Sequence, residues 1–359
     1  MKTQFKLTAL AVATLALTAC GGSSSDDDNA AQKPTDTIYG PFNTGTTSEP
    51  ASVYFDLETM AVVTESADWD ISFRRTDVFL NNTDSDNPVK AYFTGNNADF
   101  YDADSKAVAD KFANATPETE LADFEAVTAA SIPADDMFVA DVAEKILDGF
   151  YSYNPTTHQV SAADDKYFIV SSDDSYSKYR VSSLTQAGFA MSAVTFAIAN
   201  QSASDAAFAT SETQLVVDLA AECANDATVY VDFDTAMVVA STDAWDVSLA
   251  CNADKTGTGF EISLATDATA IQDFTNSYDS ITASHHFGYG FKANEYTDPA
   301  FKANPWYAYG VNGGHTLWSQ YGVYIIKTDI ADYKLQITSY YNDDGASGNY
   351  SFRAERLDD

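Results

Sequence analysis

The feature that most constrains this chain is an internal repeat. Residues 52–73 align with residues 228–249 at a constant offset of 176, without a gap and with nine identities in 22 positions. Chance matching would give about one or two identities in a window of this length. A chain that repeats a segment of this kind is expected to repeat a structural unit as well.

A second pair of segments extends the repeat. The aromatic runs 150–153 and 306–309 are each followed by a histidine and a tyrosine that lie nine residues apart, His158 with Tyr167 and His315 with Tyr324. Residues 201–207 form a polar connector of small residues before the second copy. We therefore predict two tandem domains, residues 37–205 and residues 211–359.

The periodicity within each copy is that of β-strands. Short runs of β-branched and aromatic residues alternate with Asp, Ser, Thr and Asn clusters, and 13% of the chain is aromatic. This pattern predicts an all-β fold, with each copy a β-sandwich-like sheet pair. The interval between Asp70 and Phe150 is longer than the corresponding interval in the second copy, which indicates an insertion in the first domain.

Part of this insertion is predicted to be helical. Apolar residues follow the i, i+3, i+4, i+7 spacing of an amphipathic helix. They are Val139, Val142, Ala143, Ile146 and Leu147. We expect this stripe to pack on the sheet as part of the core.

The N-terminal residues are typical of a bacterial lipoprotein signal. Lys2 and Lys6 precede an apolar run that is too short to span a membrane, and the run ends in Leu-Thr-Ala-Cys. We predict a signal peptide over residues 1–19, acylation of Cys20, and a flexible polar tether over residues 20–36. Gly21 gives no Asp-type signal for retention in the inner membrane, so the expected location is the outer membrane, periplasmic or surface-exposed.

Charge excludes one class of partner. The chain has 19 basic and 53 acidic residues, a formal net charge of −34. A negative field of this size repels a phosphate backbone, so we expect no nucleic-acid binding.

The remaining cysteines predict a disulfide. With Cys20 acylated, only Cys223 and Cys251 are left, and an isolated pair outside the cytoplasm is normally bridged. The first copy has Thr47 and Arg75 at the positions equivalent to these two cysteines, so both are missing there together.

Several separate signatures resemble the HmuY family of haem-binding bacterial surface lipoproteins. They are Trp69-Asp-Ile-Ser-Phe-Arg-Arg75, Trp306-Tyr-Ala-Tyr309 with His315, Val323-Tyr-Ile-Ile-Lys327, Tyr333-Lys-Leu-Gln-Ile-Thr-Ser-Tyr-Tyr341 and Gly348-Asn-Tyr-Ser-Phe352. The resemblance covers nearly all of the mature chain, once per copy. It implies an all-β fold and capture of haem for an outer-membrane transporter of the TonB type. The chain departs from the pattern twice: Ala250 and Cys251 replace the Arg pair in the second copy, and the first copy lacks the Lys-Leu-Gln-Ile run.

Histidine and methionine positions are where haem binding must be sought, because haem iron is held most often by imidazole, thiolate or thioether. His158 and His315 recur at matching sites, which favours a structural role. His285 and His286 have no counterpart in the first copy and lie among Phe287, Tyr289 and Phe291, whose rings could flank a porphyrin; an exposed polar pair is the alternative.

At most one of two adjacent imidazoles is expected to reach an iron, because neighbours on a strand face opposite ways. His315 or a methionine such as Met237 would then supply the second axial ligand. We place the haem site in the second copy, where Lys292 and Lys302 follow the aromatic loop and can offset the repulsion of an anionic ligand.

Catalytic chemistry has little support. The chain contains no Gly-x-Ser-x-Gly, Cys-x-x-Cys, His-Glu-x-x-His or phosphate-binding glycine loop, and we expect no enzyme. The acidic stretches 81–87 and 99–104 have oxygen ligands suited to calcium but lack EF-hand spacing, which favours solvated turns. We therefore expect no metal beyond haem iron.

Two functions remain open. The first is an outer-membrane-anchored lipoprotein that binds haem, or a related iron-porphyrin, and feeds an uptake system. The second is a structural or adhesive surface lipoprotein that uses the same β scaffold without a cofactor.

Overall fold

The computed structural model describes residues 36–357, apart from residues 85, 164, 189, 224–227, 252–260, 274–275 and 285–289. Strands, all in antiparallel sheets, are the main regular structure of these residues, and the helices are few and short. The all-β prediction is therefore confirmed. Cys20, the signal peptide and nearly all of the tether lie outside the described residues, as do His285 and His286.

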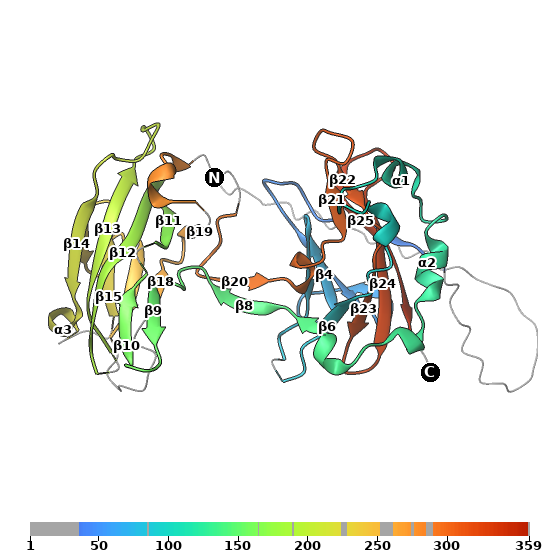
Figure 1. The fold of residues 1–359 in the computed structure, drawn as a ribbon, viewed down its shortest axis with the longest axis horizontal. Coiled ribbons are helices and arrows are strands. Elements are labelled where there is room, and N and C mark those ends of the chain that lie inside the picture. Colours follow the sequence, from blue (N-terminus) through green and yellow to red (C-terminus); the bar gives the residue numbers. More distant parts are fainter. Residues whose placement is uncertain are drawn as a thin grey trace, which may run out of the picture.

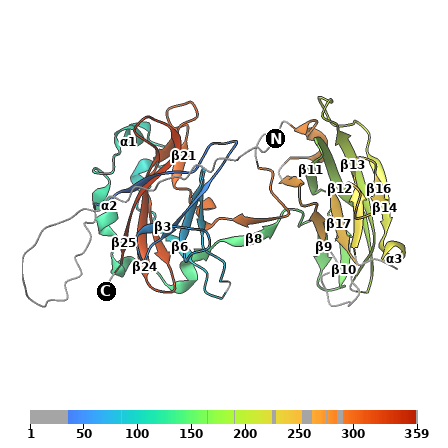
Figure 2. The same cartoon turned by 180° about the vertical axis from the view of Figure 1, so that it is seen from behind.

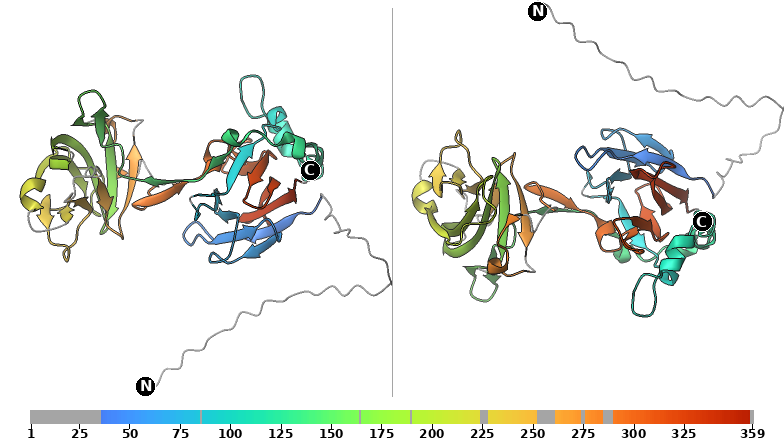
Figure 3. Two further views of the ribbon diagram at one scale, coloured as in Figure 1. Left: turned by 90° about the horizontal axis from the view of Figure 1, so that it is seen from below. Right: turned by 90° about the horizontal axis from the view of Figure 1, so that it is seen from above.

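The chain forms two bodies that do not follow its order. Body 1 comprises residues 36–141 and 299–357, and body 2 comprises residues 146–294. Between them, β8 (Val142–Lys145) and β20 (Glu295–Asp298) pair as an antiparallel ribbon. Figures 1, 2 and 3 show this ribbon between the two bodies, which lie at opposite ends of the molecule.

Body 1 is built from two sheets. Its larger sheet has the order β1 (Tyr39–Asn43), β25 (Ser347–Arg356), β24 (Asp332–Tyr341), β23 (Val323–Lys327), β6 (Lys90–Phe93) and β7 (Val139–Ala140). Its smaller sheet has the order β3 (Ala61–Val63), β2 (Ser52–Asp56), β4 (Ile71–Arg74) and β5 (Asp77–Leu80). The hairpin of β21 (Tyr307–Tyr309) and β22 (Leu317–Ser319) also belongs to this body.

Body 2 repeats this plan. Its larger sheet has the order β14 (Thr213–Asp218), β13 (Ala190–Gln201), β12 (Ser175–Ala187), β11 (Tyr167–Ser172) and β19 (Thr269–Asp273). Its smaller sheet has the order β16 (Met237–Val239), β15 (Thr228–Asp232), β17 (Val247–Ala250) and β18 (Ile262–Leu264). Its hairpin is formed by β9 (Tyr151–Asn154) and β10 (Gln159–Ala162).

Each body is a sandwich because its two sheets bury their inner faces against each other. On β15, Val229 and Val231 point inward while Tyr230 between them stays half-exposed, as the two-residue period of a strand requires. These valines pack in one core with residues of the larger sheet such as Phe168 and Phe196. The core of body 1 is formed in the same way by both of its sheets.

Short helical segments cover the outer face of the larger sheet in body 1. They are η1 (Ala98–Phe100), α1 (Ala109–Asn114), α2 (Leu121–Ala126), η2 (Ala129–Ser131) and η3 (Asp135–Met137), with η6 (Ala300–Lys302) near the ribbon. Body 2 has α3 (Leu219–Glu222) and η4 (Tyr278–Ser280). The predicted insertion therefore does contain helices.

The helix predicted over Val139 to Leu147 is wrong. Residues 139–140 and 142–145 are strands, because they pair with β6 and β20 respectively. Val139 and Val142 are about half exposed, and only Ile146 and Leu147 enter the core, in body 2. The apolar spacing over these residues thus reflects a strand crossing between bodies, and the helices lie earlier, within residues 98–137.

The two bodies are equivalent element by element, but the elements of body 1 follow one another along the chain in a circularly permuted order. The larger-sheet order β14-β13-β12-β11-β19 in body 2 corresponds to β1-β25-β24-β23-β6 in body 1. The strands that come last in body 2 therefore correspond to the strands that begin the chain. Each body takes one half from the first sequence copy and the other half from the second.

This arrangement corrects the predicted domain boundary. The connector between residues 205 and 211 joins β13 to β14, which pair in one sheet from Ala193↔Asp218 to Ile198↔Thr213. Cutting the chain there divides a sheet of body 2, because the copies 37–205 and 211–359 each contribute strands to both bodies.

The repeat extends to local hydrogen bonds. The carboxylate of Asp56 accepts the backbone N–H groups of Glu58 and Thr59, and Asp232 does the same in body 2. Four residues after each aspartate, Met60 and Ala236 have nearly the same left-handed φ, 52° and 53°.

Candidate functional site

The described residues form a cleft of about 500 Å³ between the two bodies, beside β20. Body 1 contributes Thr76, Asp77, Val78 and the segment after the ribbon; body 2 contributes Ile146, Ile271, Gln272, Gly290 and Lys292. A volume of this size is within the range of small-molecule sites, about 300–1,000 Å³, which are commonly found where two domains meet. The cleft joins two stretches that the sequence analysis placed together, one near Lys292 and one from Lys302 to Tyr307.

The segment after the ribbon supplies an apolar wall. Pro299 precedes η6, which buries Phe301 against Tyr324 with the ring centroids 4.4 Å apart. Trp306 is only 2% exposed, and its indole N–H donates to the carbonyl of Thr76 at 3.0 Å. Because this bond links the start of β21 to the turn before β5, the wall is held by both halves of body 1.

The same cleft carries mixed charge. Lys302 donates to Asp298 across 2.6 Å at positions i and i+4, and both residues line the cleft. Lys292 is exposed, but its backbone is fixed to Ala270 by two hydrogen bonds of 2.8 Å. Desolvation raises the pKa of the Asp77 carboxyl, and the positive charge of Lys292 opposes that shift.

The predicted histidine pair lies next to this cleft in the sequence but outside the described residues. On one side, the N–H of Ser284 donates to Gln201 at 2.9 Å. On the other, Gly290 lines the cleft with a φ of 102°, a conformation that side chains other than glycine rarely adopt.

His315 is not among the residues that line the cleft. It lies in the exposed turn between β21 and β22, where its Nδ1 is hydrogen-bonded to the Tyr309 hydroxyl. His158 makes the same contact with Tyr153 at 2.5 Å in the hairpin of body 2. Met237 is 57% exposed at the start of β16, also away from the cleft lining.

The predicted disulfide is confirmed. Cys223 follows α3 and Cys251 follows β17, and their Cα atoms are 5.5 Å apart. Asp218 caps α3 by accepting the N–H of Ala221, which places Cys223 beside the sheet. Both sulfurs pack against the core of body 2.

Two carboxylates that were not predicted from the sequence occupy equivalent places, the buried Asp246 and the partly buried Asp70. Asp70 accepts the N–H of Leu57 at 2.7 Å, and Asp246 accepts the N–H of Phe233 at 2.6 Å. Burial raises the pKa of each to about 6, although these backbone hydrogen bonds act in the opposite direction. Their recurrence in the aligned Trp-Asp pairs was the signal available in the sequence.

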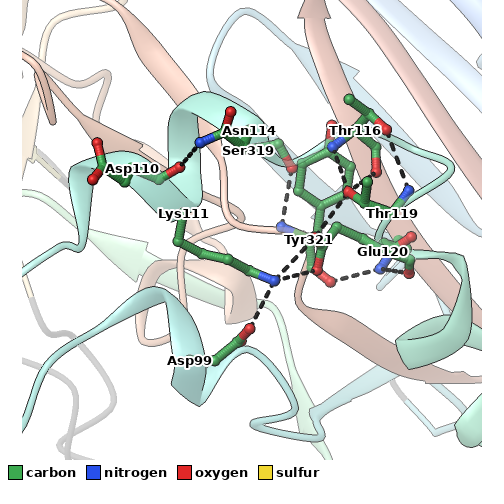
Figure 4. Close-up of polar contacts among 10 residues, drawn as sticks. Asp99, Asp110, Lys111, Asn114, Thr116, Thr119, Glu120, Ser319 and Tyr321 are labelled. Atoms are coloured by element: carbon green, nitrogen blue, oxygen red, sulfur yellow. Dashed lines mark hydrogen bonds and ion pairs between the residues drawn. The ribbon is translucent and has the colours of Figure 1, made fainter.

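A second missed group is a charged cluster beneath the helices of body 1. Lys111 lies between Asp99 at 2.7 Å and the buried Glu120 at 3.0 Å (Figure 4). Gln336 on β24 donates to the carbonyls of Glu120 and Tyr321. These contacts attach α1 and α2 to the larger sheet, so we interpret the cluster as structural.

Body 2 attaches its short helix in a similar way. Buried Lys178 on β12 donates to the carbonyls of Tyr278 and Ile281, as buried Lys334 on β24 donates to those of Phe124 and Val127. Burial lowers the pKa of Lys178. Both lysines therefore hold a covering segment on the sheet.

Among the described residues, which include 99–104 and most of 81–87, no group of three or more His, Cys, Asp or Glu is arranged to hold a metal ion. In the same part of the chain, no helix is long and apolar enough to cross a membrane. The chain matches no family model and no curated protein.

Proposed function

We propose that the protein is an HmuY-like, outer-membrane-anchored lipoprotein that binds haem, or a related iron-porphyrin, in the cleft between its bodies and passes it to an uptake system such as a TonB-type transporter. The observation that supports this proposal is the composition of the cleft. It combines the apolar side chains of Phe301, Trp306 and Tyr307 with two lysines, Lys292 and Lys302.

This composition fits the chemistry of a porphyrin. A porphyrin has apolar faces that pack on aromatic rings, and its two propionates require cationic partners. The cleft supplies both kinds of group within one volume of about 500 Å³. In a chain of net charge −34, local lysines are needed to offset the repulsion of an anionic ligand.

We place the iron ligand outside the described lining, whose only side chains of a haem-ligating kind are those of Tyr296 and Tyr307. The described residues that line the cleft include no histidine, cysteine or methionine. His285 or His286 would supply the imidazole, since residue 290 already lies in the lining. His315 is held by Tyr309 in an exposed turn and is not needed for the proposal.

A comparison of two porphyrins tests the assignment. The full-length protein is titrated with haemin and with metal-free protoporphyrin, and binding is followed by the Soret band and by quenching of tryptophan fluorescence. We expect saturable binding of both, with haemin tighter, because only haemin can use an imidazole. Equal affinity would remove the histidines as ligands, and no saturable binding of either would contradict the proposal.

The lysines are tested by neutralisation. Lys292→Gln and Lys302→Gln should each weaken binding of both porphyrins by about tenfold, the loss of roughly one charge-assisted hydrogen bond. Lys106→Gln is the matched control, because Lys106 is exposed and does not line the cleft. An equal loss in the control would point to net charge alone.

The cofactor-free structural or adhesive function has one observation in its favour. The two described histidines, His158 and His315, make the same contact with a tyrosine in equivalent hairpins, which is the behaviour of a structural residue. The titration above discriminates the two functions, because a cofactor-free scaffold gives neither a shifted Soret band nor saturation.

A further inference from the structure

We propose that a second copy of this chain is a partner of the first, through exchange of residues 299–357 between two molecules. The strands of this segment would complete body 1 of the other chain, and β8 and β20 would act as the hinge. This inference does not depend on haem binding. It rests on how body 1 is assembled and on how its halves are connected.

Body 1 is the association of two segments that are far apart in the sequence. Residues 36–141 and 299–357 meet along β1 with β25 and along β6 with β23. They also share one core, in which Phe352 contacts Phe55 at 4.9 Å and Phe73 at 5.1 Å between ring centroids. Residues 36–141 therefore present a surface that is complementary to residues 299–357, whether that segment comes from the same chain or from a second copy.

The connection between these halves runs through the ribbon and body 2. The two ribbon strands are preceded by equivalent residues, Asp141 and Asn294. Asp141 accepts the N–H of Leu80 at 2.9 Å and Asn294 accepts the N–H of Leu264 at 2.8 Å. Leu80 and Leu264 end equivalent strands, β5 and β18. The chain thus leaves each body at the same point and crosses to the other.

Such crossing strands are what a domain exchange requires. Each sequence copy already gives one half to each body, so the single chain has the topology of two exchanged units joined by residues 202–212. In an exchange between molecules, every contact inside body 1 would be kept and only the hinge would change. The free-energy difference is then small, and concentration decides between the two forms.

Two further observations favour body 1 as the exchanging body. The disulfide between Cys223 and Cys251 lies wholly within body 2, so among described residues no disulfide joins the halves of body 1. Body 1 also contains both ends of the described chain, and within the described residues the segment 299–357 is connected to the rest through β20. In the exchanged form, Phe301, Lys302 and Trp306 of the cleft would come from the second copy.

Cross-strand cysteines test the exchange. Lys90 on β6 and Lys327 on β23 are directly paired and half-exposed, so cysteines at these positions are within reach of a disulfide. One preparation carries Lys90→Cys and another carries Lys327→Cys, both with Cys20→Ser so that no other thiol is free. The two are mixed, unfolded with the native disulfide intact, refolded at rising concentration and oxidised.

We expect a covalent dimer that contains one chain of each kind, seen as a doubling of mass on a non-reducing gel, in an amount that rises with concentration. The matched control mixes Ser339→Cys with Ser351→Cys, which are paired on β24 and β25. Both lie in the segment that moves as one unit, so exchange cannot bring them together from different chains.

The double variant Lys90→Cys/Lys327→Cys in one chain shows whether the geometry permits the bond. If it oxidises within the chain while the mixture gives no linked dimer, the exchange is overturned. Linked dimers of equal amount in the control mixture would show random cross-linking and would also overturn it. If the double variant does not oxidise, the mixture is scored by size-exclusion mass, where an absence of refolded dimer counts against the proposal.

Discussion

Asp70 and Asp246 hold the same backbone position in the two bodies. Each carboxylate accepts an N–H at the turn after the first strand of the smaller sheet, from Leu57 and Phe233 respectively. The backbone N–H of each aspartate donates to a carbonyl of that strand, of Phe55 and Val231 respectively. Asp246 also accepts a hydrogen bond from the Ser172 hydroxyl of the facing sheet. The pair shows that the repeat preserves a desolvated acid, as well as a hydrophobic pattern.

These acids predict a pH dependence of stability. The folded pKa of each is about 6, above the ordinary value of 3.8. The folded state therefore binds more protons than the unfolded state between these values, so each acid stabilises the fold at low pH and loses this contribution as pH rises through 6. The unfolding free energy of the parent protein should rise when the pH falls from 7 to 4.5. We expect Asp246→Asn, which keeps an acceptor for Phe233, to reduce this rise by roughly 2 kcal/mol.

Urea unfolding at several pH values measures this gain. Asp104→Asn is the control, because Asp104 is exposed and its carboxylate makes no hydrogen bond or ion pair with the described residues. A variant curve parallel to that of the parent would show that Asp246 does not titrate in this range.

The tryptophans give a second prediction. Trp306 is 2% exposed and bonded to Thr76, so Trp306→Ala should lower the free energy of unfolding by roughly 3 to 5 kcal/mol. Trp245 contacts Tyr230 edge to face, with ring centroids 4.9 Å apart, but stays partly exposed on the outer face of body 2, so Trp245→Ala should cost less. Trp69 makes the same contact with Tyr54 in body 1, at 5.1 Å. The reverse order of stability losses would contradict the burial in the structure.

The disulfide gives a third prediction. Cys223 and Cys251 are 28 residues apart, and removing a cross-link over a loop of this length should destabilise body 2 by about 3 kcal/mol. Replacing both by serine, or adding reductant, should lower the unfolding temperature of body 2. The transition of body 1 should remain, because the cross-link lies wholly in body 2. Loss of both transitions together would show that the two bodies unfold as one unit.

Much of this fold follows from the sequence, but its connectivity does not. Strand periodicity predicts the sheets, and the shared absence of two cysteines from the first copy predicts the disulfide. The alignment of residues 52–73 with residues 228–249 shows which segments are alike. It does not show whether a strand pairs within its own copy or with the other copy. Each strand has an equivalent pairing partner in both copies, as β11 and its counterpart illustrate.

The cleft could be predicted from the sequence only in part, for the same reason. Lys292, Lys302 and Trp306 could be grouped because they are close in the sequence, but Asp77 and Ile146 come from the first copy, and the crossing strands bring the two copies together at the cleft. The apolar residues from Val139 to Leu147 match a helical spacing, while their pairing partners on β6 and β20 decide that they form strands. Long-range pairing of this kind overrides local propensity.

A cut in the connector provides the last prediction, and it tests the crossing directly. Residues 202–207 are exposed between β13 and β14, so a protease site inserted between Ala206 and Ala207 should be cleaved in the folded protein. The two fragments correspond to the two sequence copies, and each supplies half of both bodies. We expect them to elute together in native buffer and to separate only in denaturant, because separation exposes both cores. Independent elution of folded fragments would instead show that each copy closes on itself, with its own strands in one body.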